Sequence, residues 1–533
     1  MTRFNTTPEN PRKTTNCEGA PAWSMTPDMQ LYATASTSTL SGKFYEPGVP
    51  SERVKGRRGR SSYSAYGSRY DRNSKEAEMG RVNHIIELCN KCEPDFVANL
   101  AEYIRSEMYL RSVPMVMLVS LAQRGALKRQ SVPRVIQRAD EITELLSIWQ
   151  AVSGRAALKK MPNALKKGIA DAFNKFDAYG FRKYNRGGKG AITFLDAMRL
   201  THPSPKTDEQ NQVFQAIKNA SLPPIDTWET MISAAGPDAD AKRKAWEYLI
   251  SQGAKGLPYM AALRNVRNIL QANVSPQHIQ MLVDELTDTN LIAKSKQFPF
   301  RWHSAYKMLR QELQNSGPYY KPIMDALEKA IVASVANIPG FDLIQDKRFL
   351  LACDTSSSMR APFSTNSTVE LYEIALTLGL LLQQKLSFVT IGAFGDRWKA
   401  YPPSNVVLPA IGTTVGPIGD VGHSTNGYLV MQWARQTKTV YDYICLFSDM
   451  QLWNSNSWGA NASTFQKEWD LYKKEVNRDA RLVLFDLAGY GTTPVDAVRR
   501  DVFLIAGFSD KVFQVLPKLA EGQKFLQQFH RPV

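Results

Sequence analysis

The central part of the chain, from residue 80 to about 340, places apolar residues at helical spacing. Val82, Ile85, Ile86 and Cys89 follow the i, i+3, i+4, i+7 pattern of an amphipathic helix. Blocks of this kind, each roughly 10 to 18 residues long, alternate with short breaks that contain proline, glycine or asparagine. We expect roughly a dozen or more helices here, and consecutive helical hairpins over such a length are typical of an α-solenoid of the HEAT type.

The last part of the chain, from residue 347, alternates strand and helix patterns instead. Continuous apolar runs such as those at 349–353 and 443–447 predict strands that are buried on both faces. Helical patterns at 369–384 and 465–476 lie between strands, and a short helix is expected before the last strand, VFLIAGF. This alternation predicts a doubly wound, mainly parallel sheet. The predicted fold class is therefore α plus α/β, a HEAT-repeat-like helical part followed by a Rossmann-like sheet domain.

Oxygen-bearing side chains cluster where these strands end. Asp354, Ser356 and Ser358 follow the first strand in the motif DTSSSM, Asp449 ends the strand YICLFSDM, and Thr425 lies in a loop before a helix. Because the carboxyl ends of parallel strands meet at one edge of a sheet, we expect these five side chains to lie together. Carboxylates and hydroxyls are hard ligands that suit a divalent cation. The sequence therefore predicts a divalent metal site, with Mg²⁺ as the expected ion.

The positive charge of the chain lies mainly before residue 347. The formal net charge is +16, from 66 Lys and Arg against 50 Asp and Glu, whereas residues 347–533 hold 19 against 16. The stretch at 51–75 adds eight basic residues against two acids, with three tyrosines between them, and is expected to be a mobile basic insertion. A concentrated positive charge attracts polyanions such as RNA. The alternative is a well-solvated surface without a partner.

One segment of the helical part, FRKYNRGGKGAITFLDAMRLTHPSPK at 181–206, carries the strongest sign of an anion site. It places Lys183, Arg186 and Lys189 around a glycine-rich turn, followed by a helix that carries Arg199 and ends at His202. Glycines allow backbone amides to approach a phosphate. The motif lacks the complete P-loop pattern, so nucleotide hydrolysis is not expected. For His202, a simple helix C-cap is the alternative to a role in binding.

Further arginines occur later in the helical part. The helix AALRNVRNIL carries Arg264 and Arg267 three residues apart, so both point the same way. Some arginines here are expected to line the surface that the solenoid encloses.

Other features limit the location and chemistry of the protein. The five cysteines form an odd set, and the CxxC of Cys89 and Cys92 lies on a helical pattern without a second pair, so buried thiols in a reducing cytosol are expected rather than disulfides or zinc. Apolar runs stay well short of the roughly 20 residues of a membrane span. We expect a cytoplasmic protein with no membrane partner.

The motifs in their order resemble a known family. DTSSS with Thr425 and Asp449 resembles the metal-ion-dependent adhesion site of a von Willebrand factor A domain. Preceded by NCEGAPAWSMTPDMQLY, the 181–206 segment, the AALRN helix and FPFRWHSAY, it resembles the Ro ribonucleoprotein family, whose helical part is the TROVE domain, in its bacterial or phage Rsr-like form. The resemblance implies three parts: an N-terminal segment at 1–78 that packs on a helical ring and contains the insertion, a TROVE domain at 79–346, and an A domain at 347–533.

The resemblance also implies roles for residues. Both serines and the threonine would contact the metal directly, and Asp354 and Asp449 would act mostly through water. RNA-binding positions of the family fall on Lys183, on Arg186 or Lys189, on Arg199 and on His202. Two extra residues in this segment leave the choice between Arg186 and Lys189 open. Arg264 and Arg267 are the candidates for a basic hole in the ring.

The expected function is a non-catalytic RNA-binding scaffold in RNA quality control. The resemblance implies Y-like RNA on the outer face, single-stranded 3′ ends of misfolded RNA in the hole, and polynucleotide phosphorylase as a partner; we expect a monomer. An alternative is a metal-dependent protein-interaction module in a larger complex. Nuclease activity is a third hypothesis, disfavoured because the oxygen cluster has only two carboxylates.

Overall fold

The computed structural model describes residues 12–40, 75–185, 191–223, 225–313, 318–336, 340–364, 367–456, 464–508, 513–520 and 525–533. The chain divides into two compact units, each formed from separate stretches. We call Met1–Thr37 with Asp226–Phe525 the sheet unit, and Ser38–Ile225 with Leu526–Val533 the helical unit. The domain boundaries expected from the sequence remain predictions, since compact units need not coincide with domains.

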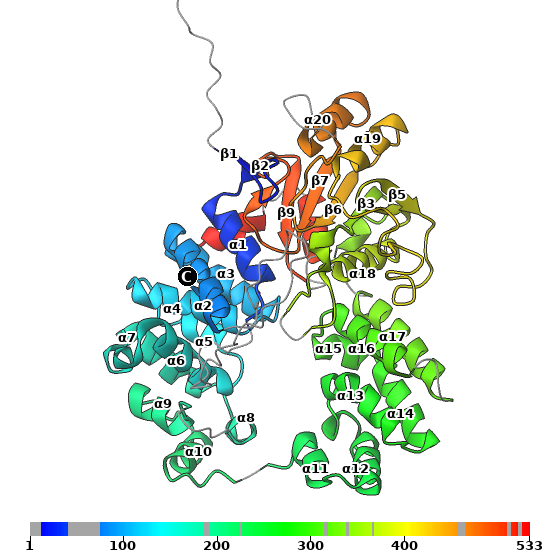
Figure 1. Ribbon diagram of the computed structural model, residues 1–533. Coiled ribbons are helices and arrows are strands. Elements are labelled where there is room, and N and C mark those ends of the chain that lie inside the picture. The colour runs from blue at the N-terminus through cyan, green and yellow to red at the C-terminus, as the bar shows by residue number, and fades with distance from the viewer. Residues whose placement is uncertain are drawn as a thin grey trace, which may run out of the picture. The chain divides into compact units, whose positions relative to one another are not determined.

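A six-stranded sheet forms the centre of the sheet unit, in the order β5-β4-β3-β6-β7-β9 (Figure 1). Its strands are β3 (Arg348–Asp354), β4 (Phe388–Phe394), β5 (Trp398–Tyr401), β6 (Tyr443–Ser448), β7 (Arg481–Asp486) and β9 (Val502–Ala506). All neighbours are parallel except β4 and β5. The chain leaves β3 for β4 on one side and later returns to β6 on the other, so the strand order reverses at β3.

Helices cover this sheet because its strands are apolar on both faces. Every residue of β6 is buried, and α18 (Leu371–Gln383), buried along nearly its whole length, packs against β3, β4 and β6. The other helices of this part are α19 (Tyr428–Gln436), α20 (Phe465–Glu475) and α21 (Val515–Ala520). The predicted fold class, helices followed by a doubly wound sheet domain, is confirmed. The short helix expected before the last strand is wrong, because residues 494–501 form turns.

The described residues 12–37 of the N-terminal segment are part of the sheet unit. Its strands β1 (Lys13–Thr15) and β2 (Pro21–Ser24) form a hairpin that pairs with β8 (Thr492–Thr493) in a second, antiparallel sheet. The helix α1 (Pro27–Thr37) follows and packs against β9. The Tyr32 hydroxyl accepts a hydrogen bond of 3.1 Å from the backbone N–H of Ala506. Sequence patterns did not indicate these strands, because each is too short for a period of two to show.

The described residues between 226 and 340 form seven α-helices that also belong to the sheet unit. They are α11 (Trp228–Ala234), α12 (Ala239–Ser251), α13 (Tyr259–Gln271), α14 (Pro276–Thr287), α15 (Thr289–Ser295), α16 (Phe300–Leu313) and α17 (Tyr320–Ser334). A buried polar chain joins three of them: the Trp302 indole donates to the Tyr259 hydroxyl at 3.0 Å, which donates to the Leu286 carbonyl at 2.9 Å. These bonds satisfy polar atoms that burial would otherwise leave without partners.

The helical unit contains nine α-helices among its described residues. They are α2 (Lys75–Lys91), α3 (Pro94–Ser106), α4 (Ser112–Gln123), α5 (Ser131–Val135), α6 (Asp140–Ser153), α7 (Asn163–Phe173), α8 (Ala178–Tyr184), α9 (Phe194–Thr201) and α10 (Asp208–Lys218). A buried ion pair, Arg105 to Glu141 at 2.7 Å, connects α3 to α6. The C-terminal residues join this unit, where the Asn99 side chain donates to the carbonyls of Phe529 and Arg531.

None of the helices in the described ranges combines the length and the apolar character that crossing a membrane would require.

Glu285 of α14 provides a test of how the helices of the sheet unit pack. It is 8% exposed, its Oε1 accepts no hydrogen bond from described residues, and burial, followed by the charge of Asp288, raises its pKa to about 7. A carboxyl group whose pKa is higher in the folded than in the unfolded protein contributes stability at low pH. That contribution is lost as the pH rises from 4.5 through 7, because the buried group must then become charged. We expect Glu285→Gln to raise the free energy of unfolding by roughly 2–3 kcal/mol at pH 8 and by little at pH 4.

Chemical denaturation at both pH values measures this difference. The exposed neighbour Asp284, changed to Asn, is the matched control and should shift stability by less than about 0.5 kcal/mol. Equal effects of the two substitutions at pH 8 would contradict the buried, raised-pKa state of Glu285.

Candidate metal and RNA sites

The five predicted metal ligands lie where the strand order of the main sheet reverses. Asp354 ends β3, and Asp449 directly follows β6, the parallel neighbour of β3. In open α/β sheets this reversal leaves a crevice beyond the carboxyl ends of the strands, where ligands bind. The loop that carries Thr425 is held to the DTSSS loop, because the Ser357 N–H donates to the His423 carbonyl at 3.0 Å.

Short contacts connect the members of this cluster. Ser356 Oγ lies 3.3 Å from Ser358 Oγ, and the Ser356 N–H donates to Asp354 Oδ1 at 3.0 Å. Ser448, the last residue of β6, donates to Asp354 Oδ2 at 2.6 Å. Thr425 donates to the carbonyl of Gln451, whose own N–H donates to Asp449 Oδ1 at 3.1 Å. The fold therefore brings the five residues to one edge, as the sequence predicted.

The two carboxylates are in an unfavourable environment. Both are buried, and burial together with the charge of Asp449 raises the pKa of Asp354 well above its ordinary value. Burial also raises the pKa of Asp449, an effect that the nearby Ser358 hydroxyl opposes. Asp449 Oδ2 is buried and accepts no hydrogen bond from any residue in the described ranges. A buried acceptor of this kind beside a second carboxylate fits a cation, which would neutralise both charges.

The five side chains of the cluster differ in their exposure to solvent. Asp354, Ser356, Thr425 and Asp449 are 5% exposed or less, whereas Ser358 is exposed. A cation held by these residues would therefore meet solvent on the Ser358 side.

Three neighbours of the cluster, Gln451, Cys17 and Asp486, were not singled out from the sequence. Gln451 accepts a 3.0 Å hydrogen bond from the backbone N–H of Cys17, which places the N-terminal hairpin beside the site. Asp486, at the end of β7, is a third buried carboxylate whose pKa burial raises to about 7, with backbone N–H bonds opposing and the charge of Asp449 adding to the shift. The position of Asp486 after the apolar run of β7 was a signal that the sequence offered. No sequence pattern indicated the contact between Cys17 and Gln451.

The predicted RNA-binding segment forms α8 and α9 of the helical unit. The two helices meet through Phe181 and Phe194, whose ring centroids lie 5.1 Å apart in a buried cluster with Phe173 and Phe214. Thr193 begins α9 with a reciprocal capping box to Asp196. Lys183 and Arg199 therefore lie on two helices that pack directly against each other.

Cationic and aromatic groups are available on these helices. Lys183 Nζ lies 5.6 Å from the ring centroid of Tyr179 and 5.8 Å from that of Tyr184, and Tyr179 is 54% exposed. Arg199 is exposed and forms no ion pair with a described residue. His202 is also exposed and is the C-cap of α9, with φ 50° and ψ 58° and its N–H bonded to the Met198 carbonyl. A role of its side chain in RNA binding stays a prediction. The tyrosines were not singled out from the sequence.

Two predicted residues of this segment, Arg186 and Lys189, lie outside the described residues, as does nearly all of the basic insertion at 51–75. Their roles remain predictions.

Arg264 and Arg267 lie on α13, in the sheet unit and not in the unit of α8 and α9. Arg264 is exposed and Arg267 is half-buried, with its guanidinium 3.4 Å from Asn268 Oδ1. Desolvation and the like charge of Arg264 lower the pKa of Arg301 on α16. Arg301 is therefore a third arginine near Arg264 and Arg267. In the sequence, Arg301 lies within the FPFRWHSAY motif.

Two family models match the chain. The model of the TROVE domain matches residues 212–337, and that of the Ro60 vWA domain matches residues 348–520. The first range contains Arg264 and Arg267 but neither α8 nor α9.

Similarity also extends to individual proteins. RNA-binding protein RO60 of Deinococcus radiodurans is 20% identical over 470 residues, which cover 79% of this chain and 84% of that protein. Telomerase protein component 1 of Mus musculus and that of Rattus norvegicus are 23% and 22% identical, over 44% of this chain and only 12% of their own lengths. The crystal structure of Deinococcus radiodurans RO (RSR) protein aligns with a TM-score of 0.54 and 16% identity, covering 93% of this chain and 100% of that one, which shows a shared fold.

Proposed function

Because this chain is a Ro-type protein that joins a TROVE domain to a Ro60 vWA domain, we propose that it is a non-catalytic RNA-binding scaffold. The observation that carries the proposal is the α8–α9 surface, by which we mean Tyr179, Lys183, Arg199 and His202. It combines two cations that form no ion pair with described residues, an exposed ring and a histidine. Cations hold phosphates, and rings stack on unpaired bases. The name of the RO60 relative, an RNA-binding protein, agrees with this function.

The finer parts of the proposal concern the RNA and its fate. The α8–α9 surface would bind a Y-like non-coding RNA, and single-stranded 3′ ends of misfolded RNA would contact a basic surface that includes Arg264 and Arg267. Polynucleotide phosphorylase is the proposed protein partner, in cytoplasmic RNA quality control. In this scheme the chain selects and positions RNA, and the partner degrades it.

We also propose that Asp354, Ser356, Ser358, Thr425 and Asp449 hold a divalent cation, Mg²⁺ being the expected ion. The ion would supply positive charge that offsets the two buried carboxylates. The hydroxyls and carboxylates of this chain fix the loops after β3 and β6 in one arrangement. Since Ser358 is exposed, an acidic group of a partner protein could complete the site from that side, which supports the second candidate function, a metal-dependent protein-interaction module.

Direct binding of RNA tests the main proposal. We expect the purified chain to bind a hairpin RNA with a single-stranded 3′ tail, and log K to fall linearly with log salt concentration because phosphate contacts release counterions. Fluorescence anisotropy over a salt series measures both quantities, and the RNA should remain intact throughout. A chain that captures protein partners only in the presence of divalent metal, and binds no RNA, would support the second candidate instead.

A further inference from the structure

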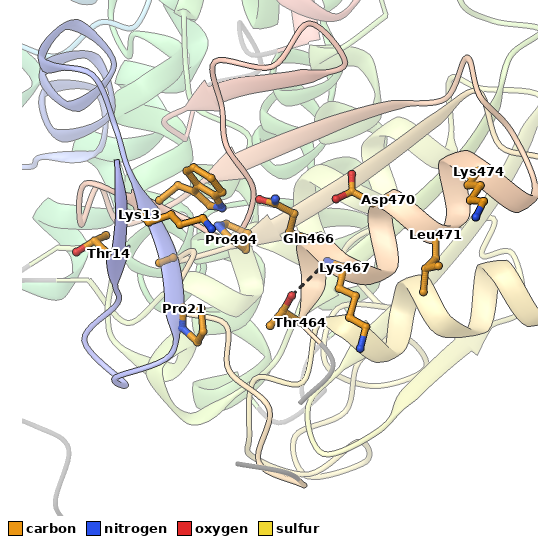
Figure 2. Close-up of a pocket in the computed structure, with 12 residues that line it drawn as sticks. Lys13, Thr14, Pro21, Thr464, Gln466, Lys467, Asp470, Leu471, Lys474 and Pro494 are labelled. Carbon is orange, nitrogen blue, oxygen red and sulfur yellow. Dashed lines mark hydrogen bonds between the residues drawn. The ribbon is translucent and has the colours of Figure 1, made fainter. Parts of the chain in front are cut away.

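A groove between the N-terminal hairpin and α20 belongs to neither site described above. It has a volume of about 520 Å³, within the range of small-ligand pockets. Figure 2 shows Lys13, Thr14 and Pro21 of the hairpin on one side, and Lys467, Asp470 and Lys474 of α20 on the other. The remaining lining residues are Ala22, Trp23, Thr464, Gln466, Leu471 and Pro494.

The hairpin wall of the groove is held firmly. Trp23 sits on the middle strand of a three-stranded sheet, opposite Lys13 of β1 and Thr493 of β8. Beside them, the Arg12 guanidinium donates two hydrogen bonds, of 2.6 and 2.8 Å, to the carboxylate of Asp496. The half-buried indole of Trp23 is therefore presented from a backbone that is paired on both sides. A fixed ring loses little conformational entropy when a second ring stacks on it.

The charge of the groove is positive. Lys13, Lys467 and Lys474 are exposed, and none forms an ion pair with a residue in the described ranges. The lining acid, Asp470, already accepts a 2.6 Å hydrogen bond from Arg499, so it does not neutralise them. Lys13 Nζ lies 5.8 Å from the centroid of the Trp23 ring, which puts a cation and an aromatic face side by side.

We propose that this groove binds single-stranded RNA, with a base on the Trp23 indole and phosphates on the lysines. The inference rests on the proposed RNA-binding function and adds a second contact, on the sheet unit. Proteins bind single-stranded nucleic acid of any sequence through aromatic side chains, on which bases stack, and through cations that lie along the phosphate backbone. Lys467 and Lys474 lie seven residues apart on one helix, about 10.5 Å along its axis, so they suit successive phosphates better than one anion. A free mononucleotide shares the chemistry but offers a phosphate at one end only.

The test uses the full-length chain and an unstructured RNA of about ten nucleotides that carries 4-thiouridine. We expect Lys467→Gln/Lys474→Gln to lower the slope of log K against log salt by about 1.4, because each lost phosphate contact on a single strand contributes about 0.7. Trp23→Leu should weaken binding at least about fivefold through the lost stacking. Ultraviolet crosslinking of the wild type should label the peptide that contains Trp23.

Matched variants separate a groove effect from a change in net charge. Lys438 and Arg478 are exposed, belong to the same unit and lie outside the groove, so Lys438→Gln/Arg478→Gln changes the charge equally and should leave the slope unchanged. Thermal melting checks that each variant is folded. If Trp23→Leu melts early, the lysine pair, both members of which are exposed on α20, still decides the result.

Four results would overturn the proposal. If the groove variants bind the short RNA as the controls do, or if the wild type binds tailed hairpin RNA but not the short strand, the groove assignment is wrong and the proposed function stands. If uridine monophosphate displaces the short RNA at equal concentration, the groove is a mononucleotide site. A wild type that binds neither RNA overturns the proposed function together with the groove.

Discussion

Changing Lys183 and Arg199 together to glutamine is expected to weaken the binding of tailed hairpin RNA by roughly 30-fold at about 0.15 M salt. Each cation that neutralises a duplex phosphate contributes about 0.9 to the slope of log K against log salt, so the slope should fall by about 1.8. The two residues lie on the packed helices α8 and α9, and the substitutions remove no ion pair among the described residues. Anisotropy titrations at several salt concentrations measure both effects.

The control for this pair is Lys91→Gln/Lys159→Gln. Both control lysines are exposed, belong to the helical unit, form no ion pair with described residues and lie outside the α8–α9 surface. The same loss of two charges there should change the slope little. Equal slopes for the two double variants would show that net charge, and not the α8–α9 surface, attracts the RNA.

Removing divalent metal is expected to lower the melting temperature of the protein. An ion that binds only the folded state stabilises it by about 2.7 kcal/mol at a hundred times its Kd, which for a domain of this size is a shift of roughly 5–10 °C. Asp449→Asn should abolish the response to Mg²⁺, because it removes one of the two charges proposed to hold the ion. Ser358→Ala should weaken the response without changing the charge. Calorimetry with Mg²⁺ and with chelator measures these shifts.

Asp486→Asn is the matched control for the metal experiment. Asp486 is also a fully buried carboxylate, the charge of Asp449 helps to raise its pKa, and its Oδ2 likewise lacks a hydrogen bond from described residues. It lies outside the five predicted ligands, so its variant should keep the full response to Mg²⁺. Loss of the response in Asp486→Asn, with Asp449→Asn unaffected, would mean that the ligand set derived from the sequence is wrong.

Much of the sheet could be predicted because its strands are buried on both faces. Such strands appear as continuous apolar runs, and the runs of β3 and β6 end at Asp354 and Asp449 in the sequence itself. Parallel pairing then places both carboxylates at one edge without further information. The capping of α9 could be anticipated for the same local reason, since Thr193 and Asp196 are three residues apart.

Contacts between distant segments could not be predicted in this way. The hairpin strands are three and four residues long, and nothing in their sequence indicates that Trp23 pairs with Thr493 or that Cys17 donates to Gln451. Asp486 became relevant only because β7 lies next to β6. Register and neighbour identity depend on long-range packing, which leaves no periodic signal along the chain.

The sequence by itself determined the change from a helical part to alternating strands and helices, the five oxygen side chains near the strand ends and the basic segment around α8 and α9. These are local properties, since apolar spacing, capping residues and charge act over a few neighbours. The tertiary structure alone decided which distant side chains share a surface: the third carboxylate near the metal edge, and the groove between Trp23 and α20. Those arrangements depend on packing between segments that are far apart in the chain.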